Sequence, residues 1–144
     1  MSNTLVAPLI MGFESCRLKA YQDRGGVWTC GWGSTGPDIT STTIWTQQQA
    51  DDRFAATLSK TLIGVRASVR IPISEKQEAA LCSFAYNVGP EAERTSTLLQ
   101  YVNSGAWFSV VREWIKWDHV GKDEDRGLLI RRLKEAAIFL EGSA

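Results

Sequence analysis

The chain has 144 residues, of which 44% are hydrophobic and 22% are charged, and its formal net charge is zero. This composition is typical of one globular domain and excludes a disordered chain. Neither half of the sequence is strongly basic, so we do not expect nucleic-acid binding, which needs clustered cations against the phosphates.

Few residues could bind a metal or form a disulfide: three cysteines, Cys16, Cys30 and Cys82, and one histidine, His119. The odd cysteine count and the lack of a CxxC pair argue against a zinc site. Reduced, buried thiols, suited to a reducing cytosol, are the simplest interpretation. His119 lies outside any catalytic motif, so we expect a satisfied or exposed side chain rather than a base.

The N-terminal stretch MSNTLVAPLIMGFE is mostly apolar. It is too short to cross a membrane, which takes about 20 residues, and it lacks the basic region and cleavage site of a signal peptide. We therefore expect no export signal and no stable membrane insertion. Its apolar residues recur at helical spacing, which predicts a helix over about 3–15 with Glu14 at its C-terminal end. A carboxylate there meets the negative end of the helix dipole, so Glu14 is either incidental or held partly protonated.

Residues 17–45 break the helical pattern and predict a small antiparallel sheet. Val27–Cys30 has strand-forming residues, and glycine-rich turns flank it at 24–26 and 31–37.

Two capping-box patterns, starting at Thr46 and Ser74, predict helices that run to about residue 65 and residue 88. Gly89-Pro90 ends the second helix. Further helices are predicted at about 95–103, 106–117 and 126–140. One apolar stripe in this part is expected to lie in the core: Trp107, Val111, Trp114 and Trp117.

These elements predict an α+β fold class in a single domain covering 1–144. A small β-sheet lobe, at about 15–60, is joined by a long helix to a mainly helical lobe formed by about 1–14 and 61–144. A cleft between two lobes is a common place for an active site.

The stretch from Phe13 to Thr35 contains two carboxylates, Glu14 and Asp23, and then Thr29. Cleavage of a glycosidic bond needs one protonated and one ionised carboxyl group, in environments that separate their pKa values. Glu14, next to Phe13, is the candidate for the drier acid, and Asp23 beside Arg24 for the ionised group. Thr29 could orient a water near Asp23. Spacing alone does not distinguish this pair from two solvated charges near a hairpin.

The pattern of Glu14, Asp23 and Thr29, followed by Gly31-Trp32-Gly33, resembles the catalytic segment of the phage-type lysozymes, the endolysins of glycoside hydrolase family 24. The resemblance runs from about Leu5 to Leu140. Further segments carry it, in the same order as in the family: 18–23, 26–29, 83–89, 96–99, 114–117 and 127–132.

This resemblance implies a lysozyme-like fold and a muramidase that hydrolyses the β-1,4 bond between N-acetylmuramic acid and N-acetylglucosamine in peptidoglycan. Glu14 would be the general acid, and Asp23 would activate the water with help from Thr29. Inversion at the anomeric carbon would need the two carboxyl groups about 6.5–9.5 Å apart. No metal or cofactor is implied.

The resemblance also implies substrate contacts. Tyr86 and Asn87 match positions that line the family's cleft, although a core tyrosine at a helix end is the alternative for Tyr86. Ser34 and Thr35 are expected to touch the glycan from the hairpin. One of two adjacent arginines, Arg131 and Arg132, is expected to pair with an acid behind the site while the other is solvated.

Three departures from the family pattern stand out. Ser34 replaces a usual histidine, which affects local sheet stability more than chemistry. Cys30 replaces a usual isoleucine beside Thr29. The segment 90–94 is unusually acidic for a loop near an anionic substrate, which would weaken binding in a salt-dependent way.

As an endolysin, the chain would stay in the host cytoplasm as a monomer until a holin gave it access to the periplasm and cell wall. Two other functions remain open. A catalytically silent peptidoglycan-binding module would keep the fold without the chemistry. A lytic transglycosylase would need a single acid, so Asp23 would be dispensable.

Overall fold

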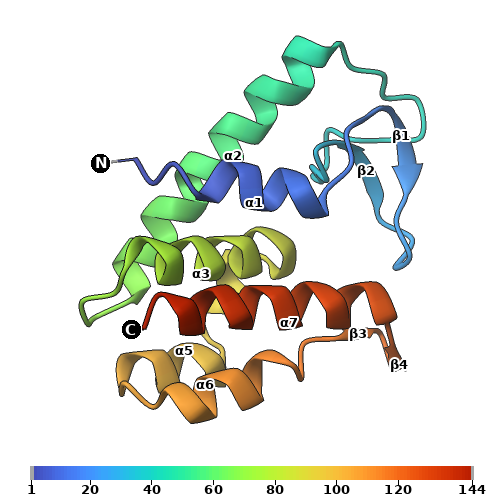
Figure 1. Ribbon diagram of the computed structural model, residues 1–144. Coiled ribbons are helices and arrows are strands. Elements are labelled where there is room, and N and C mark those ends of the chain that lie inside the picture. Colours follow the sequence, from blue (N-terminus) through green and yellow to red (C-terminus); the bar gives the residue numbers. More distant parts are fainter. Residues whose placement is uncertain (1, 144) are drawn as a thin grey trace.

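The computed structural model describes residues 2–143, and it confirms the predicted α+β fold class (Figure 1). In chain order the elements are α1 (Val6–Phe13), β1 (Arg17–Gln22), β2 (Trp28–Gly31), α2 (Gln47–Ser68), α3 (Glu75–Val88), α4 (Pro90–Arg94), α5 (Thr97–Asn103), α6 (Trp107–Trp114), β3 (His119–Val120), β4 (Asp123–Glu124) and α7 (Arg126–Glu141).

Both predicted capping boxes are confirmed. The Thr46 hydroxyl accepts a hydrogen bond from the backbone N–H of Gln49, whose side chain bonds back to the N–H of Thr46. Ser74 and Gln77 form the same reciprocal pair at the start of α3. These bonds satisfy N–H groups that a helix start otherwise leaves unpaired. The helix predicted from Thr46 continues to Ser68, so the expected lobe boundary near residue 60 lies inside α2.

Three elements differ from the predictions for local reasons. Proline was expected only to end the preceding helix, but Pro90 opens the short helix α4, since its missing N–H is not needed in a first turn. The helix predicted at 106–117 ends at Trp114, where i→i+3 bonds tighten the last turn. The segment predicted to be irregular at 121–125 contains part of the hairpin formed by β3 and β4, which is too short to show a strand pattern.

The β lobe is built on the antiparallel pair of β1 and β2, in which Tyr21 lies opposite Thr29. An isolated bridge between Lys19 and Ile44 extends the sheet. A small core forms on it from Ala20, Cys30 and Ile39, with Trp28 and Trp45 packed against it.

The helical lobe is organised around α3, which packs against α1, α2, α4 and α7 (Figure 1). Its core contains the predicted tryptophan stripe: Trp114 is fully buried, and Trp107, Val111 and Trp117 pack against the same cluster. Aromatic side chains meet edge-on there, with Phe84 and Trp114 ring centroids 5.8 Å apart. Among residues 2–143, no helix combines the length and the apolar character needed to cross a membrane.

Candidate active site

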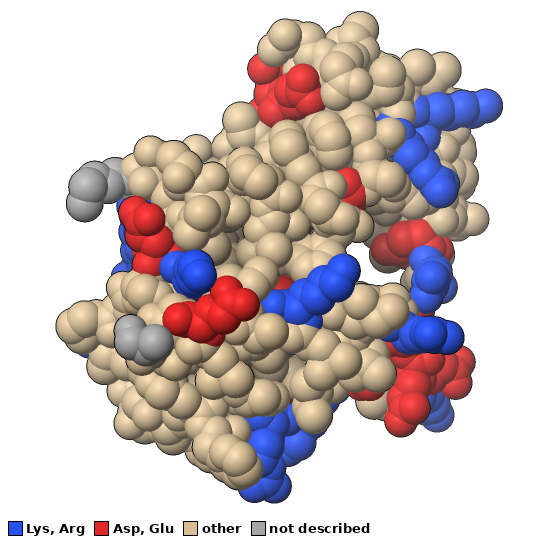
Figure 2. Space-filling view, in the orientation of Figure 1, with Lys and Arg blue, Asp and Glu red and all other residues tan. Residues whose placement is uncertain are grey.

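A cleft of about 790 Å³ lies between the two lobes, and the notch that it makes is visible at the right of Figure 2. Glu14, Asp23 and Thr29 all line it. Glu14 comes from the end of α1, Asp23 from the turn after β1, and Thr29 from β2. The fold therefore brings the three predicted catalytic residues to one cavity.

Glu14 is the residue that ends α1. Its backbone is extended, and its N–H donates to the Ile10 carbonyl at 2.9 Å, which completes the last turn. Its side chain is 18% exposed, whereas Asp23 is an exposed residue, so Glu14 is the drier of the two acids, as predicted. Arg131 Nη1 lies 2.7 Å from Glu14 Oε1. This cation offsets the unfavourable position of the carboxylate at the negative end of the α1 dipole.

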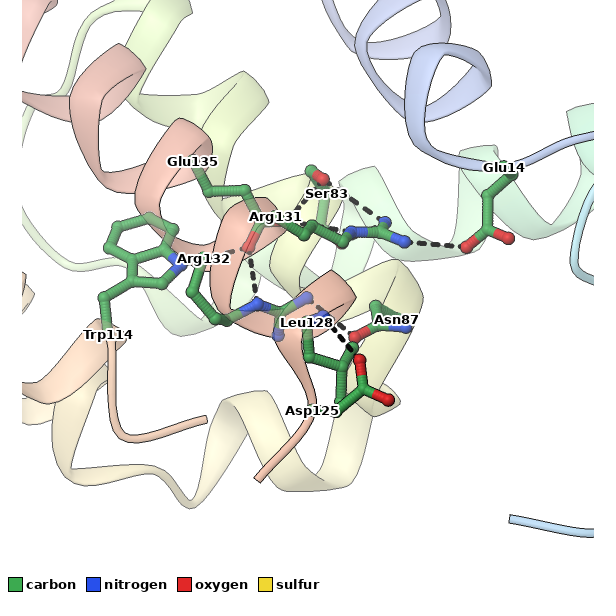
Figure 3. A network of polar contacts seen from close by, with 9 residues as sticks. All are labelled: Glu14, Ser83, Asn87, Trp114, Asp125, Leu128, Arg131, Arg132 and Glu135. Atoms are coloured by element: carbon green, nitrogen blue, oxygen red, sulfur yellow. Dashed lines mark hydrogen bonds and ion pairs between the residues drawn. The ribbon is translucent and has the colours of Figure 1, made fainter. Parts of the chain in front are cut away.

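Arg131 belongs to a buried polar network behind Glu14 (Figure 3). Its Nε lies 3.3 Å from Glu135 Oε2, and its Nη2 donates to the Ser83 carbonyl at 3.1 Å. Glu135 also accepts from the indole N–H of Trp114 at 3.1 Å. Glu135 is fully buried, and together with Ser83 it fixes the Arg131 guanidinium beside Glu14.

The expectation that one of the two adjacent arginines is solvated is wrong. Arg131 is 6% exposed and Arg132 is 0% exposed. Arg132 Nε lies 2.9 Å from Glu135 Oε1, and its Nη2 donates to Asn87 Oδ1 at 2.7 Å. Glu135 follows the two arginines by four and three residues, which places it on the same face of α7 as both. This spacing of Glu135 from the two arginines is the feature of the sequence that could have predicted the network.

Burial shifts the titration of Arg132. Loss of solvent lowers the pKa of its guanidinium to about 10, although Glu135 opposes the shift. Arg132 therefore remains a cation at neutral pH, and Glu135 serves as the counter-charge of two buried arginines.

Asp23 is positioned by its own turn. Its Oδ1 accepts hydrogen bonds from the backbone N–H groups of Gly25 at 2.9 Å and Val27 at 2.8 Å. The Asp23 N–H donates to the Val27 carbonyl at 2.9 Å, which closes the turn. Within residues 2–143 no hydrogen bond or ion pair uses Asp23 Oδ2, so this oxygen is open to a water or a substrate. Arg24 turns away from Asp23 and pairs with Asp125 at the start of α7.

Thr29 is buried, and its hydroxyl donates to the Val27 carbonyl at 2.9 Å. Because its proton is used in this bond, the hydroxyl oxygen can only accept a hydrogen bond from a water in the cleft. This arrangement is compatible with orienting a water near Asp23.

The predicted substrate contacts separate into two groups. Thr35, Tyr86 and Asn87 line the cleft, whereas Ser34 is 4% exposed and is not part of its lining. The hairpin turns the Ser34 side chain into the protein and not toward the cleft. Tyr86 is half-buried and its hydroxyl donates to the Trp32 carbonyl at 2.5 Å. Burial raises the pKa of Tyr86 to about 12, so the phenol remains a hydrogen-bond donor.

The acidic segment at 90–94 does not contribute to the cleft lining. It forms α4, where Glu91 pairs with Arg94 at 2.6 Å. The Glu93 side chain is buried and accepts from the Ser68 hydroxyl at 3.1 Å. Burial raises the pKa of Glu93.

Several residues of the cleft wall were not predicted from the sequence: Lys116, His119, Val120 and Asp125. His119 has its Nδ1 2.7 Å from Asp118 Oδ1 and is partly exposed, as expected for a satisfied histidine. Asp125 accepts from the Leu128 N–H at 2.8 Å and so caps α7, while it also binds Arg24 of the β lobe. Only the fold shows that this pair joins the two lobes at the cleft.

Comparisons of this chain with known proteins, by sequence and by structure, lead to the same group of proteins. The family model described as phage lysozyme matches residues 11–135. The chain is 34% identical over 135 residues to an endolysin of Acyrthosiphon pisum secondary endosymbiont phage 1, covering 91% of this chain and 92% of that protein. The muramidase domain of SpmX from Asticaccaulis excentricus superimposes with a TM-score of 0.81 and 29% identity, covering 96% of each chain.

The endolysin of Bacillus phage PZA is 35% identical over 137 residues, which cover 94% of this chain. The chain spans about half the length of this relative, 53%.

Proposed function

This chain belongs to the phage lysozyme family, with the lysozyme-like fold that its sequence predicted, and on that premise we propose that it is an endolysin that hydrolyses peptidoglycan. The observation that supports the proposal is the convergence of Glu14, Asp23 and Thr29 on one interlobe cleft. The cleft offers one shielded and one exposed carboxyl group, which is the asymmetry that glycoside hydrolysis needs.

The bond to be cleaved is the β-1,4 bond between N-acetylmuramic acid and N-acetylglucosamine. Glu14 gives a proton to the leaving oxygen. Arg131 binds Glu14 Oε1, which leaves Oε2 to carry that proton. Asp23 activates the water through Oδ2, and Thr29 helps to place it. Attack by this water on the face opposite the leaving group inverts the anomeric carbon. Thr35, Tyr86 and Asn87 contact the glycan from the cleft walls.

The test is clearing of outer-membrane-permeabilised Gram-negative cells, with the released muropeptides analysed by mass. We expect the wild type to clear the suspension and Glu14→Gln to lose at least about 100-fold in rate, because general acid catalysis contributes that much or more. Glu91→Gln removes an exposed acid on α4 and serves as the matched control, with activity unchanged. Clearing by Glu14→Gln at the wild-type rate would contradict the proposal.

The two alternative functions give different products in the same assay. Hydrolysis gives hydrated reducing ends. Anhydro ends, with activity retained in Asp23→Asn, would indicate a lytic transglycosylase. Binding to sacculi without clearing by either protein would indicate a silent binding module.

We also propose that the protein is a monomer that remains in the host cytoplasm until a holin opens the way to the wall. Fractionation of cells that express the native gene product without a holin tests this proposal. Arrival of the protein in the periplasm under these conditions would contradict it.

A further inference from the structure

The loop of Cys30–Ser34, which we call the 30–34 loop, passes directly behind the carboxyl group of Glu14. Gly33 has a φ of +76°, a left-handed conformation that favours glycine. A Cβ atom at Gly33 would lie 2.4 Å from Glu14 Oε2 and 2.7 Å from Glu14 Cδ, closer than real Cβ atoms approach other heavy atoms. Only glycine, which has no Cβ atom, therefore fits at position 33 without a collision with the Glu14 carboxyl group.

We propose that the 30–34 loop is the wall against which the Glu14 carboxyl group is positioned, and that Gly33 is a positioning residue for the general acid. This inference rests on the proposed function, in which Glu14 is that acid. Gly33 acts through Glu14 by leaving the space that the carboxyl group fills.

The loop cannot move back to accommodate a side chain, because it is fixed from several directions. Cys30 and Ser34 exchange backbone hydrogen bonds of 3.0 and 2.9 Å across its base. The Tyr86 hydroxyl, from α3, donates to the Trp32 carbonyl at 2.5 Å. The Trp32 indole N–H donates to Asp51 Oδ1 of α2 at 2.9 Å. The loop is thus attached to both α2 and α3.

Glu14 is the mobile partner, but only at the end of its side chain. Its backbone is fixed by the end of α1, and its Oε1 is bound by Arg131 at 2.7 Å. A methyl group at Gly33 would push Oε2 and Cδ away and disturb the contact with Arg131. This shift costs little stability because a carboxyl group at the end of a flexible side chain can rotate aside. The same shift lowers the catalytic rate, because an acid must lie about 2.6–3.2 Å from the oxygen that it protonates.

The inference predicts that activity and stability separate in Gly33→Ala. Gly105, with a φ of +71° and open space where a methyl group would lie, offers a matched control far from the cleft. Both alanine variants carry the same left-handed backbone strain. We expect similar falls in melting temperature. We expect kcat on soluble uncrosslinked glycan chains to fall about 100-fold in Gly33→Ala, as for a misplacement of about 1 Å, with KM unchanged. In Gly105→Ala, kcat should stay near the wild-type value.

Equal kcat values in the two alanine variants would overturn the inference. If Gly33→Ala does not fold, Asp51→Ala is the second variant, because it removes the carboxylate that holds the Trp32 indole N–H, lies outside the cleft lining and leaves Gly33 intact. A fall in its kcat at unchanged KM supports the inference, and an unchanged kcat overturns it.

The inference can fail independently of the proposed function. Glu14→Gln, assayed in parallel, tests whether Glu14 is the acid. A crystal structure of Gly33→Ala tests the positioning without an activity measurement. A displaced Glu14 carboxyl group, with the Arg131 contact longer than 2.7 Å, supports the inference. A carboxyl group in its wild-type place overturns it.

Discussion

Glu14 and Asp23 line the same cleft, but the protein positions them in different ways. Glu14 is bound by Arg131, which lies 117 positions away in the sequence and is itself fixed by Glu135 and Ser83. Asp23 is positioned by the backbone N–H groups of Gly25 and Val27 within its own turn. One acid depends on the packing of the whole helical lobe, and the other on a single short turn.

This difference indicates which distant substitutions should affect the position of each acid. Changes in α7 should affect Glu14 through Arg131, which binds it directly, whereas they reach the turn of Asp23 only through its neighbour Arg24, which pairs with Asp125 at the start of the helix. The buried network also links the acid to stability, because Glu135 neutralises two buried arginines. The turn around Asp23 neutralises no buried charge, so Asp23 can be substituted with little effect on folding.

The largest expected effect is on stability, from loss of the network behind Glu14. Glu135→Ala leaves Arg131 and Arg132 buried without their shared carboxylate, which should cost about 3–5 kcal/mol in the free energy of unfolding. Urea denaturation measures this. Glu141→Ala, on the same helix, removes an exposed ion pair with Lys76 and should cost less than about 1 kcal/mol. Equal losses in the two variants would show that the network does not stabilise the fold.

The next effect concerns the chemistry of Asp23. Asp23→Asn keeps the oxygen that accepts from Gly25 and Val27, so the turn should persist and the melting temperature should change little. We expect muramidase activity to fall at least about 100-fold, the usual contribution of a general base. Asp23→Ala should be equally inactive and should lose a further ~1 kcal/mol of stability, because two N–H groups lose their acceptor. An active Asp23→Asn would favour the transglycosylase reaction.

A smaller effect is expected at Cys30, which follows Thr29 and is the first residue of the 30–34 loop. Its buried thiol lies 3.5 Å from the Leu18 carbonyl, and burial raises its pKa, so it is protonated and unreactive at neutral pH. Cys30→Ser keeps a donor at this place. We expect unchanged activity and a stability loss of about 1 kcal/mol, measured by thermal unfolding. An inactive Cys30→Ser variant with an intact fold would indicate that the thiol takes part in catalysis.

The smallest effect concerns the ion pair between Arg24 and Asp125, which joins the lobes. The Leu128 N–H, and then Arg24, lower the pKa of Asp125. The stabilisation is therefore present above the unfolded-state pKa of about 3.9 and is lost as the pH falls through the lower folded-state pKa. Asp125→Asn keeps an N-cap oxygen, so it removes mainly the charge and should cost below about 1 kcal/mol at pH 7.

The pH dependence of the stability difference between the wild type and Asp125→Asn tests this prediction. Melting temperatures of wild type and Asp125→Asn, measured between pH 7 and strongly acidic pH, should converge as Asp125 becomes protonated. A constant difference across this range would mean that the charge of Asp125 does not stabilise the fold.

The sequence by itself determined the features that depend on neighbours within a few residues. The capping boxes at Thr46 and Ser74 were predictable because each partner lies three positions away. The order Glu14, Asp23, Thr29 identified the candidate acids because it matches a family pattern. The tryptophan stripe of α6 and its C-terminal turn followed from helical periodicity. For the capping boxes and the tryptophan stripe, the physical cause, a local hydrogen bond or a helical face, is already present in a short segment.

Only the tertiary structure decided how these segments meet. Arg131 reaches Glu14, Ser34 turns inward, and Arg24 pairs with a residue 101 positions away. Such contacts depend on the packing of α7 against α3 and of the β lobe against α2, which no local pattern specifies. The positioning of Gly33 against Glu14 belongs to the same class. A glycine in the sequence indicates freedom of the backbone, but which atom fills the space beside it is determined by the fold.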